Sequence, residues 1–501
     1  MNYSYLVLAA SLVTPMEALS AEPATPSADE ATAVRSWSKA DEQALRAAIT
    51  DAPSHGLTPS MFRRSLPAAT RRGAQRDEAL SEALLAYARV MLDGAVDPSS
   101  LKHLIEPYEV TDLSPWKERL HGGEAMDSLL ADLAPTLPAY AALQAELEAL
   151  RQTARDGWLP VPGHVRLGPD EPAAAAAVRT VRARLLDEQF VNADCAPPQA
   201  GPPAPGQVEV PPCVLDGVKA FQRSRGITED GAVGPATRRE MNITPRARIA
   251  TLRANLERLR WREAEPAERR VEVNIAAFTL SVHRPSEAPV QMNVITGTVA
   301  NATPLFRDVI ERVVFNPYWN VPRSITMNEI LPQLTSGTPT AVLASKNMEV
   351  VANGQVVSPG SVDWSQAQQG EFPYRVRQRP GARNALGQIK FLFPNKWSIY
   401  LHDTPSESLF DRSDRTFSHG CVRVERPSEL AVLLLGPQGW SGARVDQALA
   451  DDAPVTAELD EPVAVVLTYQ TAHDVDGRIH YEQDVYSVDK QVLAALSEKA
   501  R

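Results

Sequence analysis

The hydrophobic positions in the first third of the chain recur with the period of a helix. Over residues 37–155, apolar residues return every three or four positions, as at Leu80, Leu84, Tyr87 and Met91. This spacing gathers them on one face of a helix and leaves the other face polar. Residues 37–173 are therefore predicted to form an all-helical scaffold domain. No catalytic constellation is visible in it.

A second helical unit is predicted for residues 174–245. Short apolar faces, such as Val218 with Phe221, are separated by the turn signals Asp230-Gly231 and Gly234-Pro235. Glycine and proline in these positions end one helix and begin the next. Residues 246–266 then predict a connecting helix, with leucines on one side and arginines on the other.

The period changes from 3.6 to 2 close to residue 267. Alternating apolar and polar residues, as in 271–275 and 278–282, are typical of strands with one buried face. Residues 267–450 are therefore expected to form a β-rich domain. The fold class predicted for the whole chain is a multidomain α+β protein.

Two segments modify this β-rich domain. Residues 323–383 lack the alternation and are predicted to be an inserted cap; the alternative is a surface excursion without catalytic consequence. Residues 451–501 contain a further strand, an Asp476-Gly477 turn and a final helix. They are expected to complete the domain, with the hairpin at that turn joining its sheet.

The N-terminus carries features of an export signal. In residues 1–21 an apolar run has the length of a signal-peptide core and is too short to cross a bilayer, although no Lys or Arg precedes it. Residues 22–36 are small, polar and proline-containing, which predicts a flexible leader. No other stretch is apolar and long enough for a membrane span.

Composition narrows the class further. A chain of 501 residues with 44% hydrophobic and 23% charged residues fits a globular protein with several cores. The formal net charge of −11 argues against coating nucleic acid, which requires a surplus of Lys and Arg.

The chain has three cysteines, an odd number. In an exported protein this suggests one disulfide and one free thiol. Cys195 and Cys213 bracket a proline- and glycine-rich loop and are the natural pair, with two unpaired thiols as the alternative. Closing a loop of this size would stabilise the fold by roughly 3 kcal/mol. The pairing leaves Cys421 reduced.

Cys421 lies in the stretch Ser418-His-Gly-Cys-Val-Arg423, which has the ingredients of an activated nucleophile. A thiol at its ordinary pKa is little ionised at neutral pH, so a base is needed. His419 is close in sequence, whereas His402 ends a predicted strand and can lie across from the cysteine loop. We favour His402 as the base. The amides of Gly420 and Cys421 are candidates for an oxyanion hole.

Two other interpretations of these residues are possible. Cys421 could be a structural thiol and His402 a core histidine. A zinc site formed by His402, His419 and Cys421 is a further alternative, although it lacks an obvious fourth ligand.

The stretch around Cys421, with Tyr400-Leu-His-Asp-Thr404 upstream, resembles the SHGC[V/I]R signature of the L,D-transpeptidase (YkuD-like) family. The longer run resembles the large, scaffolded murein L,D-transpeptidases of Gram-negative bacteria. Its further pieces are Asn316-Pro-Tyr-Trp-Asn-Val-Pro322, Gln378-Arg-Pro-Gly381, Asn384-Ala-Leu-Gly387 and Lys390-Phe-Leu-Phe-Pro-Asn395. Residues 174–243 also resemble the three-helix peptidoglycan-binding domain; a helical spacer that no longer binds glycan is the alternative.

This resemblance implies roles for individual residues. Cys421 would be the nucleophile and His402 its base, oriented by a main-chain oxygen rather than by Asp403. Residues expected near the substrate are Tyr400, Arg423, Trp319 and Asn384. Supporting residues are Ser418, His419 and Gly420.

The resemblance also implies the reaction and its place. The enzyme would attack the bond after the third residue (meso-diaminopimelate) of a peptidoglycan tetrapeptide stem, release D-Ala and form a 3→3 crosslink in the periplasm. No metal or organic cofactor is implied, carbapenems would acylate the same cysteine, and other wall-synthesis enzymes are possible partners. Water or a lipoprotein lysine as acceptor, or a silent wall-binding scaffold, are the alternatives.

Overall fold

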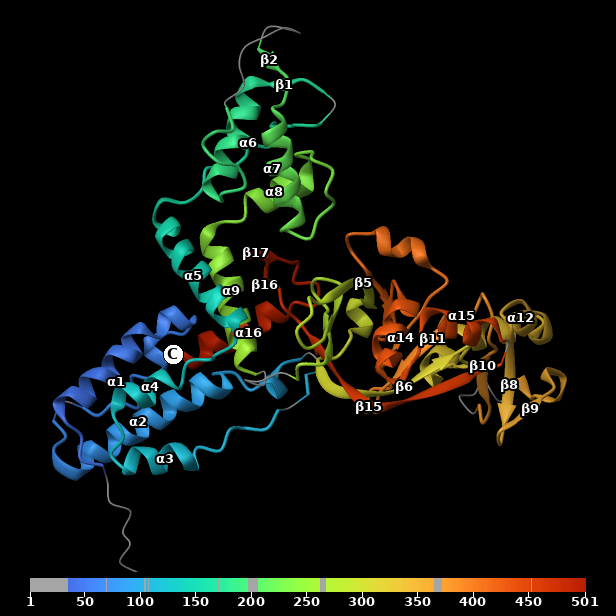
Figure 1. Cartoon of the computed structure of the whole chain (residues 1–501), viewed down its shortest axis with the longest axis horizontal. Coiled ribbons are helices and arrows are strands. Elements are labelled where there is room, and N and C mark those ends of the chain that lie inside the picture. The colour runs from blue at the N-terminus through green and yellow to red at the C-terminus, as the bar shows by residue number, and fades with distance from the viewer. Residues whose placement is uncertain are drawn as a thin grey trace, which may run out of the picture.

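The computed structural model describes residues 35–68, 70–102, 105–106, 108–169, 171–196, 206–261, 267–364, 372–451 and 453–501. The expected signal peptide and nearly all of the leader lie outside these ranges. Along the chain, a helical N-terminal region is followed by a smaller helical unit and then by a β-rich C-terminal domain (Figure 1).

The N-terminal region consists of helices, two of whose connections are long segments that contain 3-10 turns. Its first helix begins where Ser38 and Asp41 form a reciprocal capping box, which satisfies amides that a helix start leaves unpaired. The helices of this region are α1 (Lys39–Asp51), α2 (Gly73–Asp93), α3 (Ser114–His121), α4 (Met126–Ala131) and α5 (Pro138–Asp156).

The second unit, at the top of Figure 1, contains three helices and a short two-stranded sheet. Cys195 and Cys213 form a disulfide within it, as expected from the loop that they bracket. Gly226 has a left-handed φ of +59°, and a Cβ there would lie 2.1 Å from Oε2 of Glu482, so this close approach requires glycine. The elements are β1 (Ala173–Ala174), α6 (Ala175–Asp187), β2 (Gln207–Val208), α7 (Pro212–Arg223) and α8 (Pro235–Met241).

Helix α9 (Pro245–Arg260) links this unit to the β-rich domain, and it lies beside α5 (Figure 1). Arg248, Arg258 and Arg260 are buried because each finds an acidic partner, as Arg260 does in the fully buried Glu257 at 2.9 Å. A buried charge pair of this kind fixes geometry more than it adds stability, since both ions lose their hydration.

The β-rich domain is built on one sheet whose strand pairings close into a ring. The order is β5-β14-β12-β11-β6-β15-β3-β4, with β4 pairing back to β5 and β13 added to β5. The strands are β3 (Arg270–Asn274), β4 (Thr279–His283), β5 (Val290–Gly297), β6 (Phe306–Phe315), β11 (Ile389–Leu392), β12 (Leu401–His402), β13 (Thr416–Ser418), β14 (Val422–Val424) and β15 (Val455–Thr468). Helices α14 (Pro427–Leu435) and α15 (Gly442–Ala450) lie between β14 and β15 along the chain.

An inserted unit leaves the sheet after β6 and returns before β11. It has its own four-stranded sheet and its own hydrophobic cluster, which includes Val321, Leu334 and Val350. Its elements are β7 (Trp319–Asn320), α10 (Arg323–Ile325), a π-turn η5 (Thr326–Ile330), α11 (Leu331–Ser336), α12 (Pro339–Ser345), β8 (Met348–Ala352), β9 (Gln355–Val357) and β10 (Arg375–Gln378).

The C-terminal segment differs from the expectation. Strand β15 does complete the main sheet, between β6 and β3, but the hairpin β16 (Ala472–Val475) and β17 (Arg478–Tyr481) forms a separate two-stranded sheet. Its apolar side chains pack on α5 and α9 instead, and the Tyr481 N–H donates to the Ser224 carbonyl at 2.8 Å. The final helix α16 (Val488–Lys499) also packs on α9. The hairpin therefore docks the three-helix unit.

The scaffold and the β-rich domain share one hydrophobic core. A single cluster runs from Trp37 and Leu45 in the helical region to Val271 and Phe391 in the sheet. The N-terminal helices are thus packed into the domain rather than tethered to it. Within the described residues, no helix is long and apolar enough to cross a membrane.

Candidate active site

Two neighbouring strands and the residues next to them place four of the predicted site residues on one face. In the parallel pair β12–β14, His402 lies opposite Arg423, and the Val422 N–H donates to the Tyr400 carbonyl at 3.1 Å. Because strand side chains alternate, Tyr400 and His402 point the same way, as do Cys421 and Arg423. The rings of Tyr400 and His402 lie 5.6 Å apart. Cys421 is therefore flanked by Tyr400, with His402 one step along the face.

The Cys421 thiol rests in a partly buried position among hydrogen-bond donors. Its Sγ lies 3.8 Å from the Ser398 carbonyl, and both the N–H and the hydroxyl of Tyr400 hydrogen-bond the sulfur. Burial raises the pKa of the Cys421 thiol, while Tyr400, Lys390 and Arg423 oppose that rise. The resting thiol is thus protonated, and a base must remove its proton during attack.

His402 has the properties of such a base. It is 4% exposed, and its Nδ1 lies 2.5 Å from the carbonyl oxygen of Asp403. Because that oxygen can only accept, Nδ1 carries the hydrogen and Nε2 keeps its lone pair. Burial, together with the charges of Arg423 and Lys390, lowers the pKa of His402 to about 3, so the imidazole is neutral at physiological pH.

The Asp403 carboxylate takes no part in this arrangement. It accepts from the amides of Gln388 at 2.7 Å and Thr404 at 2.6 Å. The main-chain carbonyl of Asp403 is what orients the imidazole. This geometry matches the expectation that Asp403 does not form a triad.

Lys390 was not among the predicted site residues. Strand β11 pairs it with His402, and its Nζ lies 3.7 Å from the centre of the Tyr400 ring. Burial lowers the pKa of this lysine. The signal in the sequence is a single lysine among the apolar residues of a short strand, on the face shared with His402.

The turn that carries the nucleophile is held by Ser418. Its hydroxyl donates to the Cys421 carbonyl at 2.5 Å and accepts from the Gly420 N–H at 3.0 Å. The Gly420 amide is therefore already engaged, and its expected part in an oxyanion hole is wrong. The Cys421 N–H makes no hydrogen bond to any residue that the structure describes, so it is the remaining candidate donor.

His419 points toward the inserted unit. Its Nε2 lies 2.8 Å from Oε1 of Glu329, with both side chains about half exposed. The ring lines a cavity of about 520 Å³ together with Gly420 and, from the scaffold, Lys102. Because His419 faces Glu329, the alternative zinc set is not gathered; no cluster of metal-ligand type lies within the described ranges.

The two remaining predicted contacts behave differently from each other. Trp319, on β7 of the inserted unit, hydrogen-bonds the Tyr400 side chain and so reaches the site. Asn384 is 1% exposed and braces a loop: its amide donates to the carbonyls of Pro317 and Arg379 and accepts from Leu386. The geometry thus gives Asn384 a structural place instead of the expected substrate contact.

Comparisons with known proteins find similarity in the β-rich domain and in the N-terminal region. Residues 268–446 match the model of the L,D-transpeptidase catalytic domain (YkuD), and residues 36–147 match a scaffold domain. A curated protein of Haemophilus influenzae (strain ATCC 51907 / DSM 11121 / KW20 / Rd), named "Putative L,D-transpeptidase", is 36% identical over 260 residues. The match covers 52% of this chain and 51% of that protein, so the chain spans about half the length of its curated relative.

A solved structure is also similar. It is the crystal structure of the L,D-transpeptidase (residues 123-326) from Xylanimonas cellulosilytica DSM 15894, 14% identical, with a TM-score of 0.19 and coverage of 62% of this chain and 99% of that one. At this TM-score it carries no argument. The β-rich domain is thus similar to the YkuD catalytic domain that the sequence resembled. In this chain the segment similar to an L,D-transpeptidase catalytic domain follows one similar to a scaffold domain.

Proposed function

We propose that this protein is a peptidoglycan L,D-transpeptidase that forms 3→3 crosslinks in the periplasm. The observation that carries the proposal is the placement of the Cys421 thiol and the neutral His402 imidazole on one face of two parallel strands. The family match of residues 268–446 supports acyl transfer as the reaction class.

The first half-reaction is acylation of the cysteine. His402 Nε2 takes the thiol proton as the sulfur attacks the carbonyl carbon of the meso-diaminopimelate–D-Ala bond. The oxygen of the tetrahedral intermediate accepts from the Cys421 N–H. Collapse breaks the C–N bond, the leaving amine of D-Ala takes the proton from His402, and a thioester on Cys421 remains.

The second half-reaction returns the thiol. The side-chain amine of a neighbouring stem attacks the thioester and loses a proton to His402. The C–S bond then breaks, the thiolate recovers that proton, and a peptide bond joins the two stems. No external reductant or energy source is needed, because one peptide bond is exchanged for another.

Two cations beside the sulfur fit the carboxylates of the stem. Burial lowers the pKa of the Arg423 guanidinium, and its Nε is buried without a hydrogen-bond partner among the described residues. A carboxylate placed between Arg423 and Lys390 would satisfy this donor and offset both charges. We assign stem-carboxylate binding to this pair.

The three-helix unit is proposed to contact the glycan. A cavity of about 950 Å³ lies between this unit, the hairpin and the outward polar face of β3 and β4. Its walls carry Arg223 and Glu229 from the unit and Asn274 and Ser281 from the sheet. A groove that combines charged and polar side chains with apolar surface suits a sugar polymer, whose peptide stems would reach the active site of the same molecule.

Product analysis tests the proposal. Purified protein is incubated with disaccharide-tetrapeptide, and the products are identified by mass spectrometry. A dimer that has lost one D-Ala is expected from the wild type and none from Cys421→Ala. Monomer shortened by D-Ala alone would identify an L,D-carboxypeptidase, and transfer to an added lysine-ended lipoprotein peptide would identify an attaching enzyme. If the wild type forms no product, the protein would instead be a catalytically silent wall-binding scaffold.

A further inference from the structure

The peptide between Gly420 and Cys421 is anchored from the side opposite the reaction. The Thr303 hydroxyl donates to the Gly420 carbonyl at 2.8 Å. In a planar trans peptide the C=O and N–H bonds point in opposite directions. Anchoring the Gly420 oxygen at Thr303 therefore directs the Cys421 N–H away from Thr303, toward the side where an oxyanion would form.

The Thr303 hydroxyl is held between two backbone groups. Thr303 is fully buried, and its Oγ1 also accepts from the Gly297 N–H at 2.9 Å. The hydroxyl therefore accepts from the Gly297 amide and donates to the Gly420 carbonyl. A hydrogen bond to a carbonyl also polarises its peptide, which strengthens the N–H on the far side as a donor.

Tyr486 holds Thr303 from behind. The Tyr486 hydroxyl donates to the Gly297 carbonyl at 2.5 Å and accepts from the Thr303 N–H at 3.3 Å. Tyr486 and Thr303 thus fix both ends of the short loop that returns from β5. The loop adds one more contact with the catalytic turn, because the Thr298 N–H donates to the Ser418 carbonyl at 2.9 Å.

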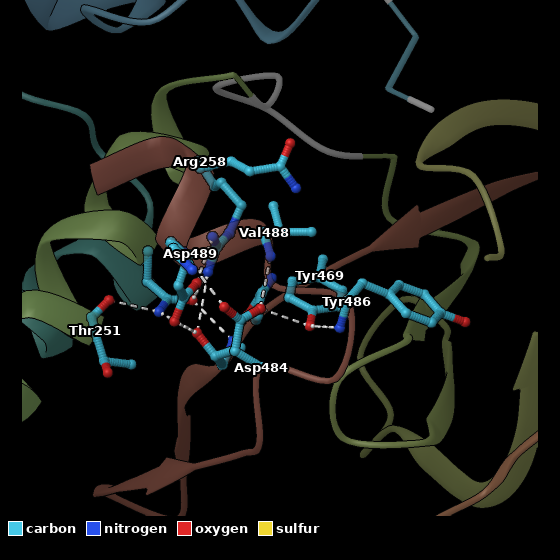
Figure 2. A network of polar contacts seen from close by, with 12 residues as sticks. Thr251, Arg258, Tyr469, Asp484, Tyr486, Val488 and Asp489 are labelled. Atoms are coloured by element: carbon cyan, nitrogen blue, oxygen red, sulfur yellow. Dashed lines mark hydrogen bonds and ion pairs between the residues drawn. The ribbon is translucent and has the colours of Figure 1, made fainter. Parts of the chain in front are cut away.

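Figure 2 shows how Tyr486 is itself fixed within the C-terminal segment beside α9. Its N–H donates to the Tyr469 hydroxyl at 2.9 Å, and that hydroxyl donates to Asp484 at 2.8 Å. The same C-terminal segment is tied to α9, where Arg258 pairs with Asp489 at 2.6 Å. These polar contacts lead from α9 to the back of the catalytic turn.

We propose that Thr303 and Tyr486 are positioning residues that aim the Cys421 N–H at the oxyanion of the acyl-transfer reaction. They touch no substrate and act only through the Gly420–Cys421 peptide. The inference rests on the proposed function, since it assumes that Cys421 is acylated. It adds two residues outside the Ser-His-Gly-Cys stretch to the machinery of that step.

Two reactions of the Cys421 sulfur distinguish a role in aiming the Cys421 N–H from a role in stabilising the fold alone. Alkylation of Cys421 by iodoacetamide requires the thiolate but forms no oxyanion, whereas acylation by a carbapenem passes through one. Both rates are measured on the full chain by intact-protein mass spectrometry. In Thr303→Val the acylation rate should fall about 100-fold, comparable to the loss of one oxyanion donor. The alkylation rate and its pH profile should stay within twofold of the wild type.

Three further variants complete the test. Thr303→Ser keeps the hydroxyl and should restore acylation, and Tyr486→Phe should lower acylation selectively, by a smaller factor. Thr468→Val is the matched control: it removes another buried hydroxyl that donates to a strand carbonyl, at Val273, and should change neither rate.

The outcomes are separable. If both rates in Thr303→Val fall together, or neither falls, the inference is overturned while acylation of the wild type still supports the proposed function. If Thr303→Val does not fold, an unchanged ratio of the two rates in Tyr486→Phe overturns it. If the wild type itself is not acylated, the proposed function fails first.

Discussion

Substitution of Tyr400 perturbs the Cys421 nucleophile most directly. Its hydroxyl hydrogen-bonds the Cys421 sulfur and receives a hydrogen bond from the Trp319 side chain. Replacing Tyr400 with Phe removes one donor to the thiolate but leaves the Tyr400 N–H, Lys390 and Arg423 in place. The variant should therefore raise the pKa of the thiol without abolishing its reactivity.

The size of this effect follows from the interaction lost. A hydrogen bond to a charged group contributes about 1.5–3 kcal/mol. Since one pKa unit corresponds to about 1.36 kcal/mol, the midpoint of thiolate formation should rise by about one to two units. The Trp319 donor is left unpaired, which should also lower the free energy of unfolding by roughly 1–3 kcal/mol.

The assay is the rate of Cys421 alkylation by iodoacetamide as a function of pH. Wild type, Tyr400→Phe and a control, Tyr374→Phe, are compared. Tyr374 packs on Phe372 inside the inserted unit, so its variant should match the wild type. A midpoint in Tyr400→Phe that is unchanged, or lower than in the wild type, would refute the role given to the hydroxyl.

Three further predictions concern stability. Replacing both Cys195 and Cys213 with Ser should lower the free energy of unfolding of the three-helix unit by roughly 3 kcal/mol in urea titrations. Activity on a soluble peptide stem should persist. Loss of that activity would contradict the separation of the three-helix unit from the active site at Cys421. Because the pKa of His402 is about 3 in the folded chain and 6.5 is its ordinary value, the unfolded chain binds more protons between these values. Stability should therefore fall as pH drops below about 6.5, by about 2 kcal/mol at pH 5 from this residue, and His402→Gln should flatten the dependence. A pH-independent difference between the two proteins would count against a buried neutral imidazole. Asn384→Ala should lower the free energy of unfolding by about 2 kcal/mol or more, because buried carbonyls lose their donor; unchanged stability with lost activity would restore the substrate contact first expected.

Much of the catalytic centre could be predicted because it is local in sequence. Alternation along 398–402 and the Ser-His-Gly-Cys stretch placed His402 and Cys421 on neighbouring segments. The parallel register of β12 and β14 then puts them on one face. Lys390 was missed because strand pairing, rather than sequence distance, brings it to His402.

The hairpin shows why other elements could not be predicted. Its alternation and Asp476-Gly477 turn are the same whether it extends a sheet or stands alone. Its place is decided by the apolar surface of α5 and α9 and by the bond from Tyr481 to Ser224. None of these partners can be identified from the hairpin's own sequence.

The roles of single polar groups were also beyond the sequence. A glycine before the nucleophile suggested a free amide, but Ser418 occupies the Gly420 N–H. The arginines on one side of α9 gave no sign of their acidic partners, Glu240 for Arg248 and Asp489 for Arg258. Whether a given polar group is already hydrogen-bonded depends on partners that only the fold brings close.

In the proposed mechanism, Cys421 is acylated with His402, and not His419, as its base. The decisive measurement is the rate at which the thioester forms on Cys421, followed by rapid-quench intact-protein mass spectrometry with disaccharide-tetrapeptide. His402→Gln should slow this step by about 10²–10⁴-fold, the usual contribution of a general base. His419→Gln should stay within about tenfold of the wild type. Rapid acylation in His402→Gln together with its loss in His419→Gln would contradict the account.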